Sequence, residues 1–450
     1  MRVSIIGPAP PLRGGVSSHT AGLERALRAR GHECTVLSYG RIYPRSLFPG
    51  RSEFSAGQLP NASAVLDTLR PDRWSEAART LSCSSPDRVV VQWWHPVTAP
   101  ALRAALTGAG DVPVAVICHN DAPHEYIPAA AALTRLTLGR ADMILCHSDT
   151  VATRVARWVA SSTSVVSCPM PILLAGDRQT PTRAEARERL GVAQDAPLAV
   201  FIGHVRRYKG LDLLLDAWRD AALPPGATLR VAGEWYVRGQ QARRLRDQAS
   251  RLAGVQVVDR FLSEAEMIDT AAAADVVVLP YRSATQSGLV PIVAALGTPM
   301  IVSGAGALAE QLAARGVRSH PTDAGAARAS EVVDLDVRGS LADALTRRLK
   351  RPLDQTAKRP VDSGAQANAR PVRRAERADL AGLERASWEP TVRAVESLKK
   401  RVVKIKFPGI EREAEFLRQK GESQSSSRMA DPSRMLKSRT VPARSRPKQP

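Results

Sequence analysis

The amino-acid sequence predicts an α/β protein with two domains, each a doubly wound parallel sheet with helices on both faces. Apolar strands alternate with helices from residue 3 to about residue 148, which is the pattern of βαβ units. A proline-bearing stretch interrupts this pattern at 171–195, and the alternation resumes at residue 199. A chain of 450 residues is also too long for one ordinary hydrophobic core.

The first domain is expected at residues 1–170. The run 3–7 is short and apolar, so the start of the chain predicts a strand and not a signal peptide. Gly31 is placed to end the first helix. The expected elements are, in order, strand 3–7, a Gly/Pro loop at 8–15, helix 16–31, strand 34–39, a loop-rich insertion at 40–62, strands 87–94 and 112–120, helix 128–139 and strand 141–148.

The second domain is expected at 196–385, after a linker at 171–195 that contains a short helix. Ser263 and Glu266 have the spacing of a capping box, which predicts a helix start. The expected strands begin at residue 199 and cover 227–235, 255–261, 276–280 and 299–303; an amphipathic helix is expected at 386–401 and a basic, disordered tail at 402–450.

Composition narrows the classes of partner. The net charge is +20, and the last fifty residues hold 13 Lys and Arg against 5 Asp and Glu. Such an excess fits nucleic acid, anionic lipid or phosphorylated small molecules. An aromatic content of 4% argues against stacking of single-stranded nucleic acid, so no specific nucleic-acid partner is expected.

Cysteine usage and hydropathy indicate a cytoplasmic protein. The five cysteines are scattered and form no C-x-x-C pair, so they predict neither a zinc site nor a disulfide framework. No apolar run approaches the roughly 20 residues that span a bilayer. The basic tail could still attract the protein to an anionic membrane surface.

Two loops carry the strongest functional signal. The first, after strand 199–203, contains Gly203, Arg206, Arg207 and Lys209. The second, at 285–288, reads T-Q-S-G before a helix. Loops at helix N-termini present backbone N–H groups and a partial positive charge, so the pair predicts a diphosphate site. The alternatives are a solvated basic loop and a simple turn.

The first domain adds a glycine pair and several histidines. Gly14 and Gly15 follow the first strand and allow close backbone approach to a ligand. They do not form G-x-G-x-x-G, so a nicotinamide site is not indicated. His119 ends a buried strand at the edge where open α/β sheets bind ligands. Further candidates are His19, His95, His124 and Glu125, whereas His147 is expected to pack at a strand end.

Several segments together resemble one family. They are FIGHVRRYKGLDLLLDAW, VAGEWY, DRFLSEAEM, ADVVVLPYRSATQSGLVPIVAALGTPMIVS and GALAE, with QWWHP and CHNDAPHE in the first domain. They are similar to retaining glycosyltransferases of family 4, which have the GT-B fold of two Rossmann-like domains around a cleft. The resemblance implies that Arg206 and Lys209 hold the nucleotide diphosphate. It also implies that His119 acts near the reacting sugar and that Glu310 belongs to a Gly-rich donor loop.

The second loop departs from the usual family pattern. Many members carry two glutamates there, one for the sugar and one for the ribose; the matching positions hold Thr285 and Val293. The loop resembles a branch with A-T-Q-S-G. In it, Gln286 could hydrogen-bond sugar hydroxyls, and the backbone of Ser287 and Gly288 could contact the β-phosphate.

The expected function is transfer of a hexosyl group from a nucleotide diphosphate sugar to a hydroxyl acceptor, which could be lipid-linked, in polysaccharide or glycolipid synthesis. The resemblance implies no metal or other cofactor. Three alternatives stay open: a non-catalytic GT-B scaffold, favoured by the missing acids; a nucleotide-sugar epimerase, disfavoured by the scarcity of carboxylates; and, more weakly, nucleic-acid binding through the tail.

Overall fold

The computed structural model describes residues 1–43, 50–54, 59–122, 127, 129–174, 180–314, 330–350 and 380–399. Met1–Arg401 forms one compact unit. The predicted tail at 402–450 lies outside the described residues, and so do two predicted site residues, His124 and Glu125.

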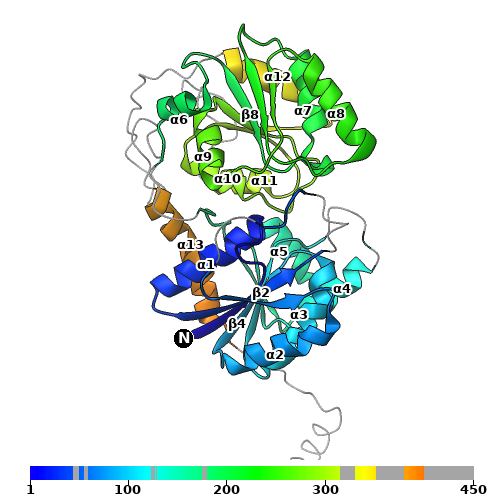
Figure 1. Ribbon diagram of the computed structural model, residues 1–450, viewed down its shortest axis with the longest axis vertical. Coiled ribbons are helices and arrows are strands. Elements are labelled where there is room, and N and C mark those ends of the chain that lie inside the picture. The colour runs from blue at the N-terminus through cyan, green and yellow to red at the C-terminus, as the bar shows by residue number, and fades with distance from the viewer. Residues whose placement is uncertain are drawn as a thin grey trace, which may run out of the picture. The chain divides into compact units, whose positions relative to one another are not determined.

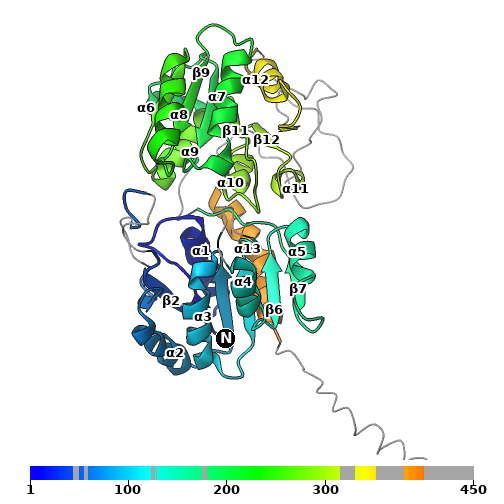
Figure 2. The ribbon, with the colours of Figure 1, turned by 90° about the vertical axis from the view of Figure 1, so that its right-hand side faces the viewer.

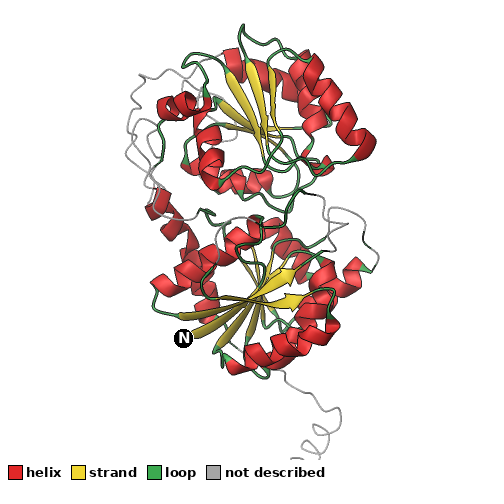
Figure 3. Cartoon of the chain, in the orientation of Figure 1, coloured by secondary structure: helices red, strands yellow, loops and turns green. Residues whose placement is uncertain are grey.

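The first domain is a parallel sheet with strand order β3-β2-β1-β4-β5-β6-β7. Helices cover both faces of the sheet (Figures 1 and 3). Its strands are β1 Arg2–Ile6, β2 Glu33–Arg41, β3 Ala62–Asp67, β4 Arg88–Trp93, β5 Val114–Cys118, β6 Met143–Cys146 and β7 Ser164–Ser167. Its helices are α1 Gly15–Ala29, α2 Trp74–Cys83, α3 Ala99–Ala105, α4 Ala130–Leu138 and α5 Asp149–Ala156, with short 3₁₀ turns at Pro71–Arg73, Pro96–Thr98 and Leu106–Ala109.

The second domain repeats this architecture with strand order β10-β9-β8-β11-β12-β13. Its strands are β8 Leu198–Ile202, β9 Thr228–Ala232, β10 Val255–Val258, β11 Val276–Leu279, β12 Met300–Ser303 and β13 Glu331–Val333. Its helices are α6 Arg183–Leu190, the 3₁₀ turn η4 Arg207–Lys209, α7 Leu211–Asp220, α8 Gly239–Arg251, α9 Glu264–Ala273, α10 Leu289–Ala295, α11 Leu308–Ala313 and α12 Ser340–Lys350. The Ser263–Glu266 capping box opens α9 as the sequence predicts.

Each sheet is buried on both faces. In β1, Ile5 faces one apolar cluster and Ile6 faces the other. In β4, Val90 and Val91 divide in the same way. Successive strand residues point to opposite faces, so a sheet covered on both sides needs continuous apolar strands. The unbroken apolar runs that predicted these strands follow from this arrangement.

The last described helix, α13 (Leu380–Ser397), packs against α1 at the other end of the sequence (Figures 1 and 2). Trp388 of α13 is 1% exposed and belongs to the same apolar cluster as Val3 and Leu23. A Cβ on Gly22 of α1 would lie 2.2 Å from the Trp388 ring. The absence of a side chain at Gly22 therefore makes room for the indole.

The structure differs from the predicted elements at several places. Strands β3, β7 and β13 were not predicted. Helix α13 starts at Leu380, six residues before the predicted start at 386. Helix α6, within the predicted linker, packs against α9, and Ala186 lies in the core of the second domain. None of the helices in the described parts of the chain is long and apolar enough to cross a membrane.

Candidate functional site

The strand order places the predicted loops at the points where winding reverses in each sheet. Strand β1 lies between β2 and β4, and β8 lies between β9 and β11. Open parallel sheets bind ligands at the carboxyl ends of strands beside such a reversal. The loops after β1 and β4 in the first domain, and after β8 and β11 in the second, occupy these positions.

Cationic side chains from both domains gather around His204. Burial lowers the pKa of His204 to about 3, and the charges of three cations add to the effect: Lys209, Arg206 and Arg13. Arg206 also lies over the ring of Tyr236, with 4.8 Å between the guanidinium carbon and the ring centroid. Among the described residues, no ion pair involves any of the three cations. Glu53 and Glu234 act on the same Tyr236 hydroxyl as Arg206 and Arg13, so these two carboxylates offset part of the positive charge without pairing with it.

Glycine geometry brings Lys209 to this position. Gly203 has φ 114°, and a Cβ there would lie 2.9 Å from Lys209 Nζ. Gly210 has φ 69°, and a Cβ there would lie 2.0 Å from the carbonyl oxygen of Pro280. Larger residues at either position would be strained and crowded. Burial lowers the pKa of Lys209, whose Nζ lies 5.0 Å from the centroid of the Tyr281 ring.

Hydrogen bonds tie together the loop after β8 and the segment after β11 in the second domain. The Arg282 guanidinium forms two hydrogen bonds with the Asp212 carboxylate, at 2.7 and 2.6 Å. It also donates to the carbonyl of Arg207, and the Arg282 backbone N–H donates to the carbonyl of Tyr208 at 2.7 Å. These bonds fix η4 against the segment that follows β11.

The second loop has less free backbone than the sequence predicts. The N–H of Ser287 donates to Oε1 of Gln311 at 2.8 Å, so in this structure it is already engaged. Thr285 is 5% exposed, and Val293 is fully buried in the second core. Gly288 caps α10, and a Cβ on it would lie 3.2 Å from Leu173.

His119 lies directly after β5 and meets the second domain. Its backbone N–H donates to the carbonyl of Trp93. Its Nε2 lies 2.6 Å from Oε1 of Gln92 in β4, and its Nδ1 lies 3.0 Å from Nε2 of Gln286. The sequence-predicted His119 and Gln286 therefore contact each other across the two domains.

Two more histidines complete a buried cluster. His19 of α1 has its ring centroid 4.7 Å from that of His119, and its Nε2 lies 3.0 Å from Nε2 of His147. Nδ1 of His147 lies 3.2 Å from the carbonyl oxygen of Cys168. Burial is the largest cause of a lowered pKa in all three imidazoles, and the value for His147 is about 4. The described residues hold no group of three or more His, Cys, Asp or Glu arranged for a metal ion.

The neutral histidine cluster predicts acid sensitivity. Each of these histidines has a folded-state pKa below the ordinary value of 6.5. Below that value the unfolded chain binds protons that the folded chain refuses, so stability falls as pH falls. We expect the free energy of unfolding to drop between pH 6.5 and pH 5 by up to about 1.4 kcal/mol per pH unit for each histidine. Urea unfolding at pH 7.5, 6 and 5 measures this; a flat profile would contradict it.

Two predicted site residues have other positions. Nδ1 of His95 accepts from the N–H of Val97 at the start of a 3₁₀ turn, and its ring packs edge-on against Tyr43. Glu310 of α11 reaches the N-terminus of α5, where its carboxylate accepts from the N–H groups of Asp149 and Thr150. Glu310 therefore joins the domains, and its carboxylate is not directed at the cations.

Sequence reasoning missed several residues of this site. Gln92 sits inside the QWWHP segment, of which only His95 was selected. The Arg13 side chain comes from the loop selected for Gly14 and Gly15, which themselves leave open space around their α-carbons. His204 and Tyr236 stack at 4.3 Å between ring centroids; each directly follows a segment that predicted a strand.

Comparison with known proteins identifies the family. A family model described as Glycosyltransferase Family 4 matches residues 13–171, and one described as Glycosyl transferases group 1 matches residues 196–336. The two matched ranges lie in the first and the second domain, and they contain Arg13 and the two loops at 203–210 and 285–288. The chain belongs to glycosyltransferase family 4.

Relatives of this family-4 chain include D-inositol 3-phosphate glycosyltransferases. The Catenulispora acidiphila protein is 32% identical over 270 residues, which are 57% of this chain and 60% of the relative. The Geodermatophilus obscurus protein is 36% identical over 142 residues, which are 29% of this chain and 31% of the relative. The match thus spans less than two thirds of either relative.

Solved structures confirm the GT-B fold of this family-4 chain. Sucrose-phosphate synthase from Thermosynechococcus elongatus has a TM-score of 0.59 at 16% identity, covering 94% of this chain and 99% of that one. Anabaena HepE in complex with UDP and glucose has a TM-score of 0.56 at 13% identity, covering 93% of this chain and 100% of that one.

Proposed function

We propose that this protein transfers a hexosyl group from a nucleoside diphosphate sugar to a hydroxyl acceptor, with retention of anomeric configuration. The observation that carries the proposal is the convergence of Arg13, Arg206 and Lys209 around His204, without a carboxylate pairing with any of these cations among the described residues. Family membership and the UDP complex of the structurally similar HepE support the same donor class.

The chemistry needs negative charge to be stabilised where it develops. In transfer, the bond between the anomeric carbon and a β-phosphate oxygen breaks, and the acceptor oxygen bonds to that carbon. The acceptor proton passes to the departing diphosphate. Fixed cations stabilise the charge on the leaving oxygen without reorganising. Arg206 and Lys209 are therefore assigned to the diphosphate, and a metal ion is not required for this role.

His119 and Gln286 are assigned to the sugar. They lie at the carboxyl ends of β5 and β11; β11 pairs with β8 at the winding reversal of the second sheet, and β5 is one strand away from the reversal of the first. A neutral imidazole and an amide can both accept and donate hydrogen bonds to hydroxyl groups. Burial keeps His119 neutral by lowering its pKa well below the ordinary value.

The acceptor is proposed only as a hydroxyl compound in polysaccharide or glycolipid synthesis. The relatives named for D-inositol 3-phosphate make a phosphorylated polyol one acceptor to test. A lipid-linked acceptor fits the basic composition, because each well-placed Lys or Arg contributes about 1 kcal/mol to the free energy of binding to an anionic membrane. On this proposal the protein acts in the cytoplasm, at the inner face of the plasma membrane.

A non-catalytic scaffold is the second candidate, favoured by one observation. Thr285 and Val293 replace the two carboxylates that many family members carry, and Val293 is sealed in the apolar core. The ribose and sugar would each lose an acidic partner. The cation cluster favours donor binding in either case, so turnover is what separates the two candidates.

A donor panel tests the proposal. UDP-, GDP- and ADP-sugars are added to the purified protein, and melting temperature and slow donor hydrolysis are followed together. A binding donor at 100 times its Kd should stabilise the fold by about 2.7 kcal/mol. Stabilisation with hydrolysis, or with transfer to inositol phosphate or lipid extract, supports the transferase. Binding without turnover supports the scaffold, and no stabilisation by any nucleoside diphosphate contradicts both.

A further inference from the structure

A line of buried polar groups runs from a backbone carbonyl in the first domain to the loop after β11. It begins at the carbonyl of Cys168, continues through His147 and His19, and resumes at Gln92 and His119. Gln286 closes it from the second domain. The members come from different elements: α1, β4, and the segments that follow β5, β6, β7 and β11.

The carbonyl fixes the direction of the first half. A carbonyl oxygen only accepts, so the proton of His147 must sit on Nδ1, 3.2 Å from Cys168 O. A neutral imidazole then has a lone pair on Nε2, and the pKa of His147 is about 4. His19 must therefore donate from Nε2 across the 3.0 Å separation, which leaves its own Nδ1 as an acceptor.

Gln92 extends the same direction of hydrogen-bond donation from His19 to His119. It is fully buried, its Nε2 has no hydrogen-bond partner among the described residues, and the same holds for Nδ1 of His19. Gln92 also lies beside His19. A leftover donor and a leftover acceptor thus belong to neighbouring side chains. With its amide nitrogen toward His19, Gln92 turns Oε1 toward His119, at 2.6 Å from Nε2.

We propose that Gln92, backed by His19 and His147, is a positioning residue that holds His119 in the tautomer with its proton on Nε2. Nδ1 of His119 is then a hydrogen-bond acceptor, and it faces the second loop at 285–288, where Nε2 of Gln286 now donates to it. A sugar hydroxyl that displaces Gln286 would donate to the same lone pair. This role of Nδ1 rests on the proposed function, whereas the tautomer is a property of the fold.

The surroundings are built for this arrangement. A Cβ on Gly7 would lie 2.5 Å from Cγ of Gln92, so the glycine after β1 leaves space for the amide. Trp388 covers His19, with ring centroids 4.8 Å apart. The groups that shift the pKa values of the three histidines are one another, Gln92 and the carbonyls of residues 168 and 169; among the described residues no carboxylate contributes.

Imidazole ¹⁵N NMR measures the tautomer directly on the full chain, with His119→Phe to assign the signal. We expect wild-type His119 to carry its proton on Nε2 and to stay neutral from pH 8 to pH 6. Gln92→Met keeps the side-chain length but removes the acceptor, so both tautomers should appear. Gln92→Glu keeps an acceptor, so the Nε2–H form should persist and the pKa of His119 should rise. A wild-type His119 protonated on Nδ1 would overturn the proposal even if neither variant folds.

Kinetics test the positioning role separately. Gln92→Met should lower kcat for donor turnover roughly tenfold or more while KM for the donor changes little. Gln92→Glu should recover part of kcat and move the acid limb of the pH profile upward. Thr137→Val, which removes a buried hydroxyl bonded to the Leu133 carbonyl in α4, is the matched control and should leave both readouts unchanged.

The outcomes distinguish the two proposals. If the wild type turns over no donor but shows the expected tautomer, the proposed function fails and the tautomer assignment stands. If the wild type is active and Gln92→Met changes the tautomer without lowering kcat, the positioning role is overturned. A Gln92→Met spectrum identical to the wild type overturns the link between Gln92 and His119.

Discussion

Lys209→Met is expected to lower kcat for donor turnover by about 100- to 1,000-fold, the usual loss when one preorganised charge partner of a transition state is removed. Methionine keeps the length of the side chain and loses its charge. The ammonium lies between Gly203 and the Tyr281 ring, and no carboxylate among the described residues forms an ion pair with it. Its charge is therefore not already neutralised by the protein. Removing it should weaken the stabilisation of the diphosphate leaving group.

The effect should also appear in binding. Burial lowers the pKa of Lys209 in the unliganded protein. A bound diphosphate favours the charged form and should raise that pKa, so nucleotide binding should take up protons at alkaline pH. Calorimetry in buffers of different ionisation enthalpy measures this uptake, and it should vanish in Lys209→Met.

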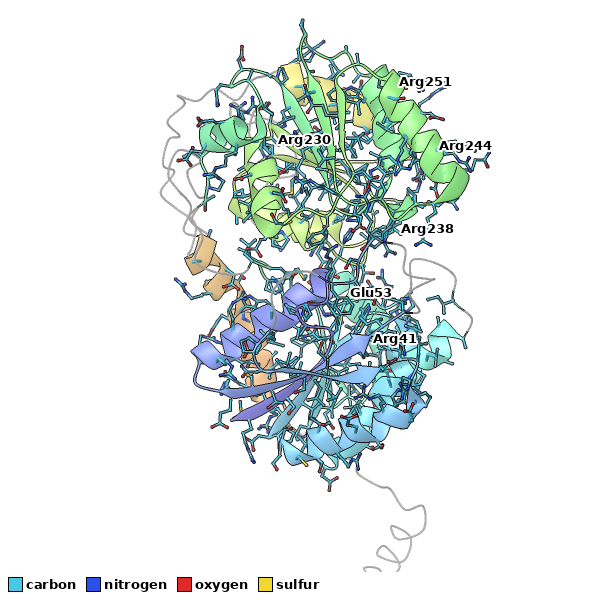
Figure 4. The ribbon with its side chains drawn as sticks, viewed as in Figure 1. Arg41, Glu53, Arg230, Arg238, Arg244 and Arg251 are labelled. Atoms are coloured by element: carbon cyan, nitrogen blue, oxygen red, sulfur yellow. The ribbon has the colours of Figure 1, made fainter. Side chains whose placement is uncertain are left out.

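A control separates site charge from net charge. Arg244 is an exposed residue of α8 that points outward from the domain (Figure 4). Arg244→Met removes the same unit of charge and should leave nucleoside diphosphate affinity and turnover within about twofold at 0.15 M salt, where distant exposed charges are screened. Equal losses in the two variants would show that Lys209 contributes only to the general positive field.

Trp388→Ala is expected to cost about 3–5 kcal/mol of the free energy of unfolding. The indole is 1% exposed, packs edge-on against His19, and its N–H donates to Glu384 at 2.9 Å. Its removal leaves a cavity between α13 and α1. Urea unfolding measures the cost, and a loss below about 1 kcal/mol would show that α13 contributes little.

Gly22→Ala provides a second test, because its effect on the free energy of unfolding should differ in sign between the wild type and Trp388→Ala. In the wild type, Gly22→Ala places a methyl 2.2 Å from the indole and should cost about 1–3 kcal/mol by overpacking. In Trp388→Ala the same methyl enters the cavity, and alanine is also favoured over glycine within a helix by about 0.5–1 kcal/mol. The substitution should then be neutral or stabilising. Additive costs in the double variant would contradict the contact.

The strands that the sequence predicted are mainly those buried on both faces. Strands β4, β5, β8 and β11 read as continuous apolar runs because helices cover both sides of each sheet. Strands β3, β7 and β13 lie at sheet edges, and β3 and β7 are partly exposed. Serine, alanine or acidic residues interrupt their apolar runs, which makes these strands resemble loops, whereas the edge strand β10 keeps three valines and was predicted. The first turns of α13 pack Leu383 on the core of the second domain and pair Glu384 with Arg25 of α1, and no local pattern encodes these contacts.

The site divides in the same manner. Arg206, Lys209 and His119 were predictable because each follows a strand within a recognisable segment. Of the residues that contact His119, His19 and Gln286 were selected from the sequence, whereas Gln92 was not and His147 was expected only to pack at a strand end. The contacts themselves could not be predicted, because these residues lie far from His119 in sequence. The order β1-β4-β5-β6 sets four strand ends side by side and gathers these groups. The sequence could therefore locate the charged and histidine side chains of the site, but only the order of the strands brings together the residues that surround His119.

The contact between α13 and α1 has a consequence for the order of events during synthesis. The ribosome completes all strands of the first domain before it begins the second. The surface of α1 around Gly22 nevertheless lacks its cover until residues 380–397 have left the exit tunnel. The first domain is therefore synthesised first, but its packing is completed last. Nascent chains halted before residue 380 should be cleaved by protease along α1 more readily than released chains.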